Sequence, residues 1–176
     1  MKDERAARFE TLAAAIGEPV RRFLHRRTDA DTAEDVLAET LLVCWRRLDE
    51  VPAEALPWAY VVARHCLANA DRTQRRQTRL VGRIRAVDPP AVATPVPDVG
   101  DDALDRALAS LSPDDAEVLR LWAWEDLGAG AIGTVLGISP NAASIRLHRA
   151  KQRLKVALGK IDGPDGHGQD TERSRG

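Results

Sequence analysis

Residue types that could carry out catalysis are present in this chain of 176 residues, but their spacing does not bring them together. The serines have no base at a defined spacing, and Cys44 and Cys66 lack the CxxC or Cys/His spacing of a zinc site. The histidines are scattered, at His25, His65, His148 and His167. Catalysis needs a nucleophile or an acid–base pair held in one place. We therefore expect no catalytic residue, no metal, no cofactor and no small-molecule substrate, and predict that the protein is not an enzyme.

A glycine pattern at Gly128, Gly130 and Gly133 satisfies GxGxxG, the fingerprint of a dinucleotide site. That site requires a preceding strand and an acid about 20 residues later to hold the ribose. Here the preceding segment has a helical pattern, and the first acid after Gly133 is Asp162. The pattern does not predict a nucleotide site.

The strongest local pattern covers residues 129–157. A short helix ends at Leu136, Gly137 supplies a tight turn, and Ser139 caps a new helix with Pro140 in its first turn. A buried stripe follows, at Ala143, Leu147, Ala150 and Leu154. The remaining faces carry candidate DNA-reading side chains, at Asn141, Ser144, Ile145, Arg146, His148, Arg149 and Arg153. This order is typical of a helix-turn-helix, whose second helix enters the major groove; the alternative is an ordinary helical hairpin with a basic solvent face.

Charge is segregated although the formal net charge is only −1. Residues 31–60 hold seven acids against two arginines, and residues 61–87 hold seven arginines against Asp71 alone. Residues 88–118 hold eight acids against one arginine, and residues 144–160 hold six bases and no acid. Each block could be a solvated helix face. Two separate basic blocks instead favour two contacts with a polyanion.

The elements that must position these residues are all helical in pattern. The chain is 44% hydrophobic but only 4% aromatic, and β-branched clusters are scarce. We expect helices over 5–28, broken or kinked at Pro19, over 33–48 with Thr32 as its cap, and over 57–76. A second set covers 113–126, capped by Ser112 and with Trp122 turned inward, then 129–136 and the helix after Ser139.

Four prolines within residues 87–100 indicate a linker. The prediction is an all-α protein with a domain at 1–86, a linker at 87–100, a domain at 101–160 and a disordered tail at 161–176. At about 3.1 Å per residue the linker spans up to about 43 Å. With the domain radii added, two sites could lie up to ~60 Å apart, nearly two turns of DNA.

The N-terminus has no apolar segment of a secretory signal, and the longest apolar run, residues 56–63, is too short to span a membrane. We expect a cytoplasmic protein without membrane insertion.

Several of these segments carry a resemblance to extracytoplasmic-function sigma factors of the sigma-70 family. Residues 111–121, 124–127, 136–142 and the Arg-Leu-His-Arg-Ala run at 146–150 resemble region 4 of that family. Residues 33–41 with Trp45, and residues 57–64, resemble region 2. The two sets stand in the family's order with the family's gap.

The resemblance implies a sigma factor that binds core RNA polymerase and directs initiation at promoter DNA, with an anti-sigma factor as a possible further partner. It implies that an acidic face contacts the polymerase, through Glu34, Asp35 and Glu39. The melted −10 element would meet one set of side chains, at Trp58, Tyr60, Arg64, His65, Arg72, Arg75 and Arg76. For Trp58 and Tyr60 packing in the hydrophobic core is an equal alternative. The helix after Ser139 would read the −35 element as duplex.

Two other functions stay open on the sequence alone. One is a helix-turn-helix regulator that binds duplex DNA without being a polymerase subunit, and the other is a protein-interaction module. The second arginine block argues against the first, and the capped recognition helix argues against the second.

Overall fold

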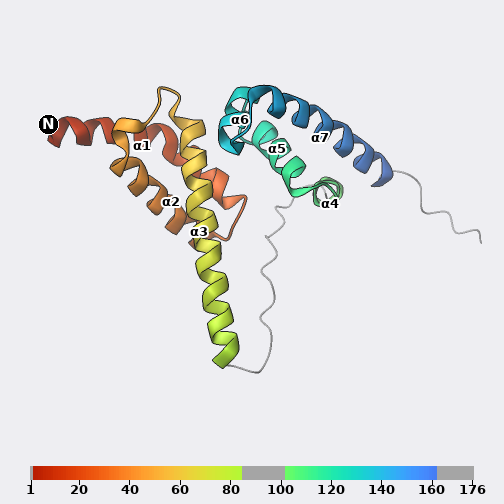
Figure 1. Ribbon diagram of the computed structural model, residues 1–176, viewed down its shortest axis with the longest axis horizontal. Helices are drawn as coiled ribbons and strands as arrows, with labels where there is room; N and C mark the ends of the chain where they lie inside the picture. The colour runs from red at the N-terminus through yellow and green to blue at the C-terminus, as the bar shows by residue number, and fades with distance from the viewer. Residues whose placement is uncertain (1, 85–101, 162–176) are drawn as a thin grey trace, which may run out of the picture.

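A computed structural model describes residues 2–84 and 102–161, and every regular element in these two ranges is helical (Figure 1). The all-α prediction is confirmed. The expected linker at 87–100 and the tail after residue 161 lie outside the described residues. The elements are α1 (Lys2–His25), α2 (Ala30–Arg46), the 3₁₀ turn η1 (Leu48–Glu50), α3 (Ala55–Ile84), α4 (Asp102–Ala109), α5 (Pro113–Ala123), α6 (Ala129–Leu136) and α7 (Pro140–Ile161).

Helices α1, α2 and α3 pack against one another and form the first group (Figure 1). Their apolar stripes meet in a core in which Val20, Phe23 and Leu24 of α1 are fully buried, together with Cys44 of α2 and Ala63 of α3. The C-terminal half of α3, which carries most of the arginine block, extends beyond the other two helices. This arrangement sets those arginines apart from the core of the three helices.

Two local expectations for this group are decided by the structure. Pro19 lies inside one continuous helix, so it does not start a second one. Thr32 does not cap α2: Asp29 does, and its carboxylate accepts a hydrogen bond from the Thr32 amide at 2.9 Å. Asp is a better cap than Thr, and Asp29 stands just before the first helical residue, so the helix begins earlier than its apolar stripe.

Helices α4, α5, α6 and α7 form the second group. Ser112 caps α5 as expected, with its hydroxyl accepting from the Asp115 amide at 3.2 Å and Pro113 in the first turn. The expectation that Trp122 turns inward is wrong, because its side chain is 42% exposed. Leu121 takes the buried position instead, and the ammonium of Lys151 lies 3.4 Å from the centre of the Trp122 ring.

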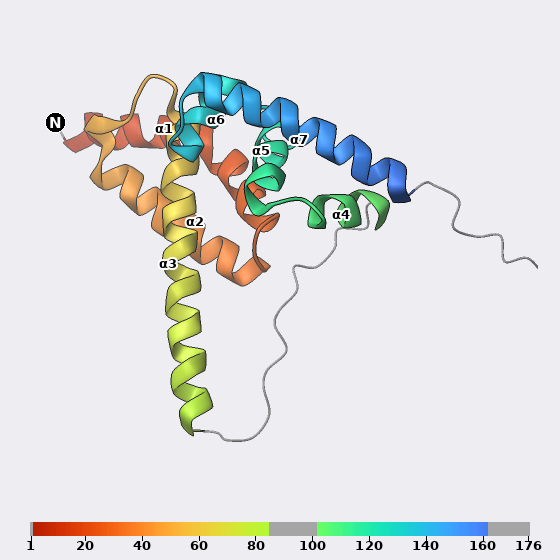
Figure 2. The same cartoon turned by 45° about the vertical axis from the view of Figure 1, so that its right-hand side comes forward.

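The two groups are packed directly against each other, with α6 against α3 (Figures 1 and 2). The buried core is continuous across the contact, since the side chains of Val118, Leu121, Ile132 and Val135 belong to the same cluster as the core of α1, α2 and α3. A smaller cluster of Leu108, Leu119 and Ala150 lies within the second group. None of the helices in the described ranges is long and apolar enough to cross a membrane.

Candidate nucleic-acid interface

The turn between α6 and α7 is fixed by two glycines. Gly137 has φ of +66°, the left-handed conformation that glycine adopts without strain. At Gly133 an added Cβ would lie 2.7 Å from the carbonyl oxygen of Ile138, so no larger residue fits between the helix and the turn. Ser139 then caps α7 by accepting a hydrogen bond from the Ala142 amide at 3.1 Å. The glycines of the GxGxxG pattern therefore lie in a helix-turn-helix and not after a strand.

Helix α7 is buried along one face and exposed along the other. Ala143 and Ala150 are fully buried, and Leu147 and Leu154 are half-buried. The side chains on the opposite face are exposed, at Asn141, Ser144, Ile145, His148 and Arg149. A rigid helix that presents polar and basic side chains near its capped N-terminus has the geometry of a recognition helix for the major groove.

Two of the predicted DNA-reading arginines point instead to the N-terminus of α5. Arg146 lies 3.5 Å from the carboxylate of Asp114, and Arg153 donates a hydrogen bond to the carboxylate of Asp115. The Asp115 side chain is only 6% exposed, so its charge depends on Arg153 for compensation. These two ion pairs hold α7 against α5. They therefore help to fix the direction in which the exposed face of α7 points.

The residues predicted to meet the −10 element divide between two faces of α3. Trp58, His65, Arg72 and Arg76 recur at spacings of seven, seven and four, which places them along one face. Trp58 is half-buried, with the Arg47 guanidinium 5.6 Å from the centre of its ring, and the other three are exposed. Arg72 also donates a hydrogen bond to Asn69, its neighbour on α3.

Tyr60 and Arg64 lie on the other face of α3, toward the second group of helices. Tyr60 is 2% exposed, with its ring 4.8 Å from that of Phe23, so here it packs in the core and is not free to stack on a base. Arg64 donates a hydrogen bond to the carbonyl oxygen of Val135 at 2.7 Å. Arg75, which the sequence places nearer this face, is exposed.

A cluster of charges that the sequence analysis missed joins the two groups. Glu125, only 3% exposed, lies 3.2 Å from both Arg26 and Arg27 and accepts a hydrogen bond from the Tyr60 hydroxyl at 3.5 Å. Glu117 lies 3.3 Å from Arg27 and 3.9 Å from Arg64. The partners are between 53 and 99 residues apart in the chain, and no spacing rule connects them.

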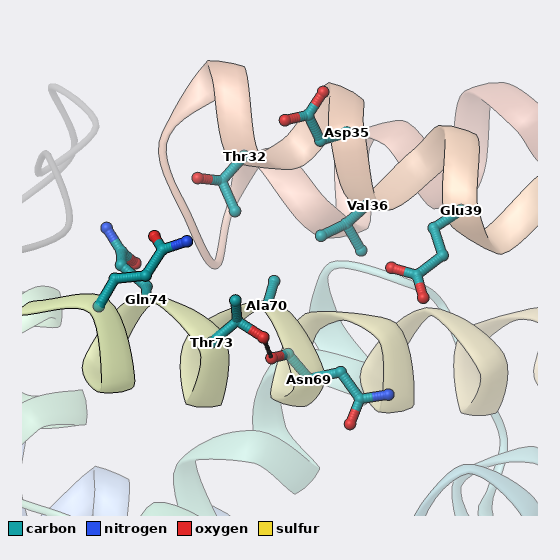
Figure 3. Close-up of a pocket in the computed structure, with 9 residues that line it drawn as sticks. Thr32, Asp35, Val36, Glu39, Asn69, Ala70, Thr73 and Gln74 are labelled. Carbon is teal, nitrogen blue, oxygen red and sulfur yellow. Dashed lines mark hydrogen bonds between the residues drawn. The ribbon is translucent and has the colours of Figure 1, made fainter. Parts of the chain in front are cut away.

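The acidic residues predicted to contact the polymerase occupy two different settings. Glu34 is bound to α1, through hydrogen bonds with His25 at 3.1 Å and Arg21 at 3.0 Å, and these partners lower the pKa of its carboxyl. Asp35 and Glu39 are exposed on α2. They form one wall of an open groove of about 400 Å³ whose other wall is α3 (Figure 3). That wall is lined by Asn69, Ala70, Thr73, Gln74 and Gln77.

The sequence is similar to those of known proteins. Residues 101–154 match the family "Sigma-70, region 4". The chain is 32% identical over 166 residues to "RNA polymerase sigma factor CarQ" of Myxococcus xanthus, covering 88% of this chain and 91% of that protein. It is 33% identical over 141 residues to "ECF RNA polymerase sigma factor SigL" of Mycobacterium tuberculosis, covering 76% and 78%.

Solved structures share the fold. The sigma factor RpoE, in a co-crystal structure with the anti-sigma factor NepR from Bartonella quintana, matches with a TM-score of 0.60 at 21% identity and covers 88% of this chain and 98% of that one. CnrH, solved in complex with the cytosolic domain of CnrY, matches with a TM-score of 0.57 at 20% identity over 88% and 89%.

The relatives match across both groups of helices and are named as polymerase sigma factors. The alternative of a helix-turn-helix regulator that is not a polymerase subunit would not account for a match of this extent. The chain belongs to the extracytoplasmic-function RNA polymerase sigma factors, and its function is promoter-directed initiation of transcription.

Proposed function

We propose that the two groups of helices divide the work of initiation between them. Residues 1–86 form a domain that binds core RNA polymerase and the −10 element, and residues 101–160 form a domain that reads the −35 element. Residues 87–100 link them. The chain contributes binding and no catalytic turnover, and it acts in the cytoplasm where polymerase meets promoter DNA. The observation that carries this proposal is the anchored, capped α7 with its open polar face, on a chain that also carries a separate basic helix.

Reading of the −35 element is assigned to the N-terminal half of α7. The backbone amides at the start of the helix can meet a phosphate, as helix N-termini do. Arg149 is the side chain best placed for a bidentate contact with guanine, and the exposed Ile145 can pack on a thymine methyl group. Asn141, Ser144 and His148 share this face. Arg146 and Arg153 support it from their ion pairs with α5.

Capture of the −10 element is assigned to the face of α3 that carries Trp58, His65, Arg72 and Arg76. Base–aromatic stacking contributes about 1–3 kcal/mol per base, and Trp58 is the aromatic residue on this face. The exposed arginines farther along α3, Arg75 included, supply charge for the backbone phosphates. Tyr60 is removed from the set of base-stacking residues because it is buried.

Polymerase binding is assigned to the exposed acids of α2. Asp35 and Glu39 lie beside the open groove between α2 and α3, where a basic side chain of the polymerase could enter (Figure 3). Glu34 contributes less, because His25 and Arg21 already bind it. An anti-sigma factor is proposed as a further partner, since a similar solved structure holds a sigma factor in complex with the anti-sigma factor NepR.

The deciding experiment is run-off transcription with core polymerase, with and without this protein, on a library of promoter fragments. We expect transcripts from a subset of fragments only when the protein is added. Tight binding to duplex promoter by the protein alone, with no recruitment by core polymerase and no transcripts, would contradict the proposal.

A further inference from the structure

Residues 47–54 connect α2 to α3 and lead to Trp58, the aromatic residue proposed to stack on a base of the −10 element. The turn η1 lies within this connection, and Leu48 is its one buried side chain. A connection that presents most of its side chains to solvent is held by few contacts of its own. The contacts that other elements make with it therefore decide where it lies beside Trp58.

Two arginines in the first two turns of α1 hold this connection. The Arg5 guanidinium donates a hydrogen bond to the Asp49 carboxylate at 2.8 Å and another to the carbonyl oxygen of Trp45 at 2.9 Å. The Arg8 guanidinium donates to the other carboxylate oxygen of Asp49 at 3.2 Å and to the carbonyl oxygen of Leu48 at 2.9 Å. Each guanidinium thus joins the Asp49 side chain to the backbone at or just after the end of α2, where helix carbonyls lack partners.

Aromatic contacts add to this attachment. The Trp45 ring packs edge-to-face with that of Phe9, with the ring centres 5.2 Å apart, and the Arg5 guanidinium lies 5.2 Å from the centre of the same Trp45 ring. A planar guanidinium can stack on an aromatic face and donate several hydrogen bonds in a fixed geometry. The start of α1 is therefore joined to the end of α2 in a defined position and not by charge attraction alone.

A second set of contacts runs from the turn to Trp58. Glu50, which follows Asp49, accepts a hydrogen bond from Nε of Arg47 at 2.9 Å and another from its Nη2. The Arg47 guanidinium, held in this way, lies 5.6 Å from the centre of the Trp58 ring. A base that stacks on Trp58 must therefore either displace Arg47 or lie against it. The position of the turn thus affects the surface on which the base would stack.

The ion pairs of Asp49 are too exposed to contribute much to the stability of the fold. The side chains of Arg5, Arg8 and Asp49 are 36%, 54% and 74% exposed. Exposed ion pairs add little to the free energy of unfolding, because water weakens the attraction between the charges. Their effect is local, since four hydrogen bonds converge on the end of α2 and the turn. Their removal should leave the helices folded.

We propose that Arg5 and Arg8 are positioning residues for recognition of the −10 element. They act through Asp49 and its turn, which holds the Arg47 guanidinium against Trp58. Base preference at the −10 element therefore depends on two arginines of α1, a helix outside the face assigned to DNA. This inference rests on the proposed capture of the −10 element by α3.

The test measures base preference in the holoenzyme by run-off transcription, on one library of promoter fragments randomised at the −10 element and another randomised at the −35 element. In R5A/R8A we expect the ratio of transcription between preferred and other bases at the −10 element to fall about two- to fivefold, the factor that an exposed ion pair can supply. The preference at the −35 element should stay the same, because it is assigned to α7. A merely structural role would instead reduce transcription from all fragments alike.

Two further variants test the route through Asp49. D49A removes the shared acceptor without changing α1 and should reproduce the loss. The combined variant R5A/R8A/D49A should lose no more than R5A/R8A, because residues of one network are not additive. The matched control is R21A/R22A, which removes two exposed arginines of α1 that pair with Glu18 and Glu34 and should leave both preferences unchanged.

The variant W58A separates failure of this inference from failure of the proposed function. Circular dichroism of each variant verifies that the helices remain folded. Loss of the −10 preference in W58A, with the preference unchanged in R5A/R8A or in D49A, would overturn the positioning role and leave the proposed function intact. Equal losses at the −10 and −35 elements in R5A/R8A would also overturn it. An unchanged −10 preference in W58A would contradict the proposed capture by α3 and, with it, the positioning role.

Discussion

Tyr60 is the only tyrosine in the chain, and it reports directly on the contact between the two groups of helices. Burial raises the pKa of its hydroxyl to about 12, and the neighbouring Glu125 carboxylate acts in the same direction. In the unfolded chain tyrosine has a pKa of about 10. Titration followed by phenolate absorbance should therefore have a midpoint near 12 in the folded protein and near 10 in denaturant.

Because its pKa is raised in the folded protein, Tyr60 makes the free energy of unfolding depend on pH. The folded protein holds the Tyr60 proton more tightly than the unfolded chain, so this contribution to stability is complete below about pH 10. It is lost as the pH rises from about 10 to about 12. A midpoint near 10 in protein that circular dichroism shows to be folded would contradict the burial of Tyr60.

Arg153 and Arg149 lie on the same helix, but replacing them with alanine should have different effects on the free energy of unfolding. Arg153→Ala leaves the buried Asp115 carboxylate without its partner, and we expect the free energy of unfolding to fall by about 1–3 kcal/mol. Arg149→Ala, at an exposed position, should change stability by less than about 0.5 kcal/mol. Denaturant unfolding of both variants measures the difference.

Arg149 and Lys155 should also differ from each other in transcription. In the holoenzyme on a randomised −35 library, Arg149→Ala should relax the preference at one base position, which is the loss of a bidentate contact. Lys155→Ala, farther along α7 and exposed, should weaken all sequences alike and reduce the salt slope by about one unit. A uniform loss for Arg149→Ala would make Arg149 a phosphate contact.

At the scale of elements, the helix-turn-helix was accessible from the sequence because each of its determinants is local. The cap at Ser139, the left-handed turn at Gly137 and the buried spacing from Ala143 onward all lie within about 20 residues of one another. The cap and the turn act through backbone geometry that tertiary packing does not need to supply. The start of α2 was misplaced because two residues able to cap, Asp29 and Thr32, lie within three positions of each other, and the apolar stripe begins after the second.

The faces of α3 and α5 could not be assigned from periodicity alone. An amphipathic stripe predicts which side is buried against the nearest helices, but Tyr60 and Arg64 are covered by helices more than 50 residues away in the chain. Trp122 was expected inward because it is large and apolar. Leu121 fills that space, and the tryptophan lies outside it under Lys151. Tertiary contacts of this kind leave no signal in local spacing.

Helix α2 yields a prediction for polymerase binding. Reversing both charges in D35K/E39K should weaken binding to core polymerase at least tenfold, because the change places two cations where the proposed partner is basic. The helical content should stay the same, since both side chains are exposed. Binding is measured by fluorescence anisotropy of labelled sigma factor with core polymerase.

The control for this variant is E10K/E18K, which makes the same change of charge on α1. That variant should keep core affinity within about twofold if charge acts locally and not through the field of the whole molecule. Equal affinity for D35K/E39K and the unmodified chain would show that the polymerase binds elsewhere.

For the whole molecule, the continuous core has a consequence for stability. Val118, Leu121, Ile132 and Val135 of the second group are buried in the same cluster as the core of α1, α2 and α3. A domain of about 60 residues buries little apolar surface by itself and is only marginally stable. The second group of helices should therefore draw part of its stability from the first through this shared core.

Thermal unfolding should display this dependence. The unmodified chain should unfold in one transition, with the two groups of helices losing protection from hydrogen exchange together. The variant E117Q/E125Q removes the charged partners of Arg26, Arg27 and Arg64 at the contact between the groups. In this variant the transition should divide, and residues 113–136 should lose protection first. Each kcal/mol lost lowers the melting temperature of such a domain by roughly 4–8 °C. E10Q/E18Q should retain the single transition, because exposed acids on α1 do not join the groups. Two separate transitions in the unmodified chain would mean that the domains are stable independently and that the shared core contributes nothing to their folding.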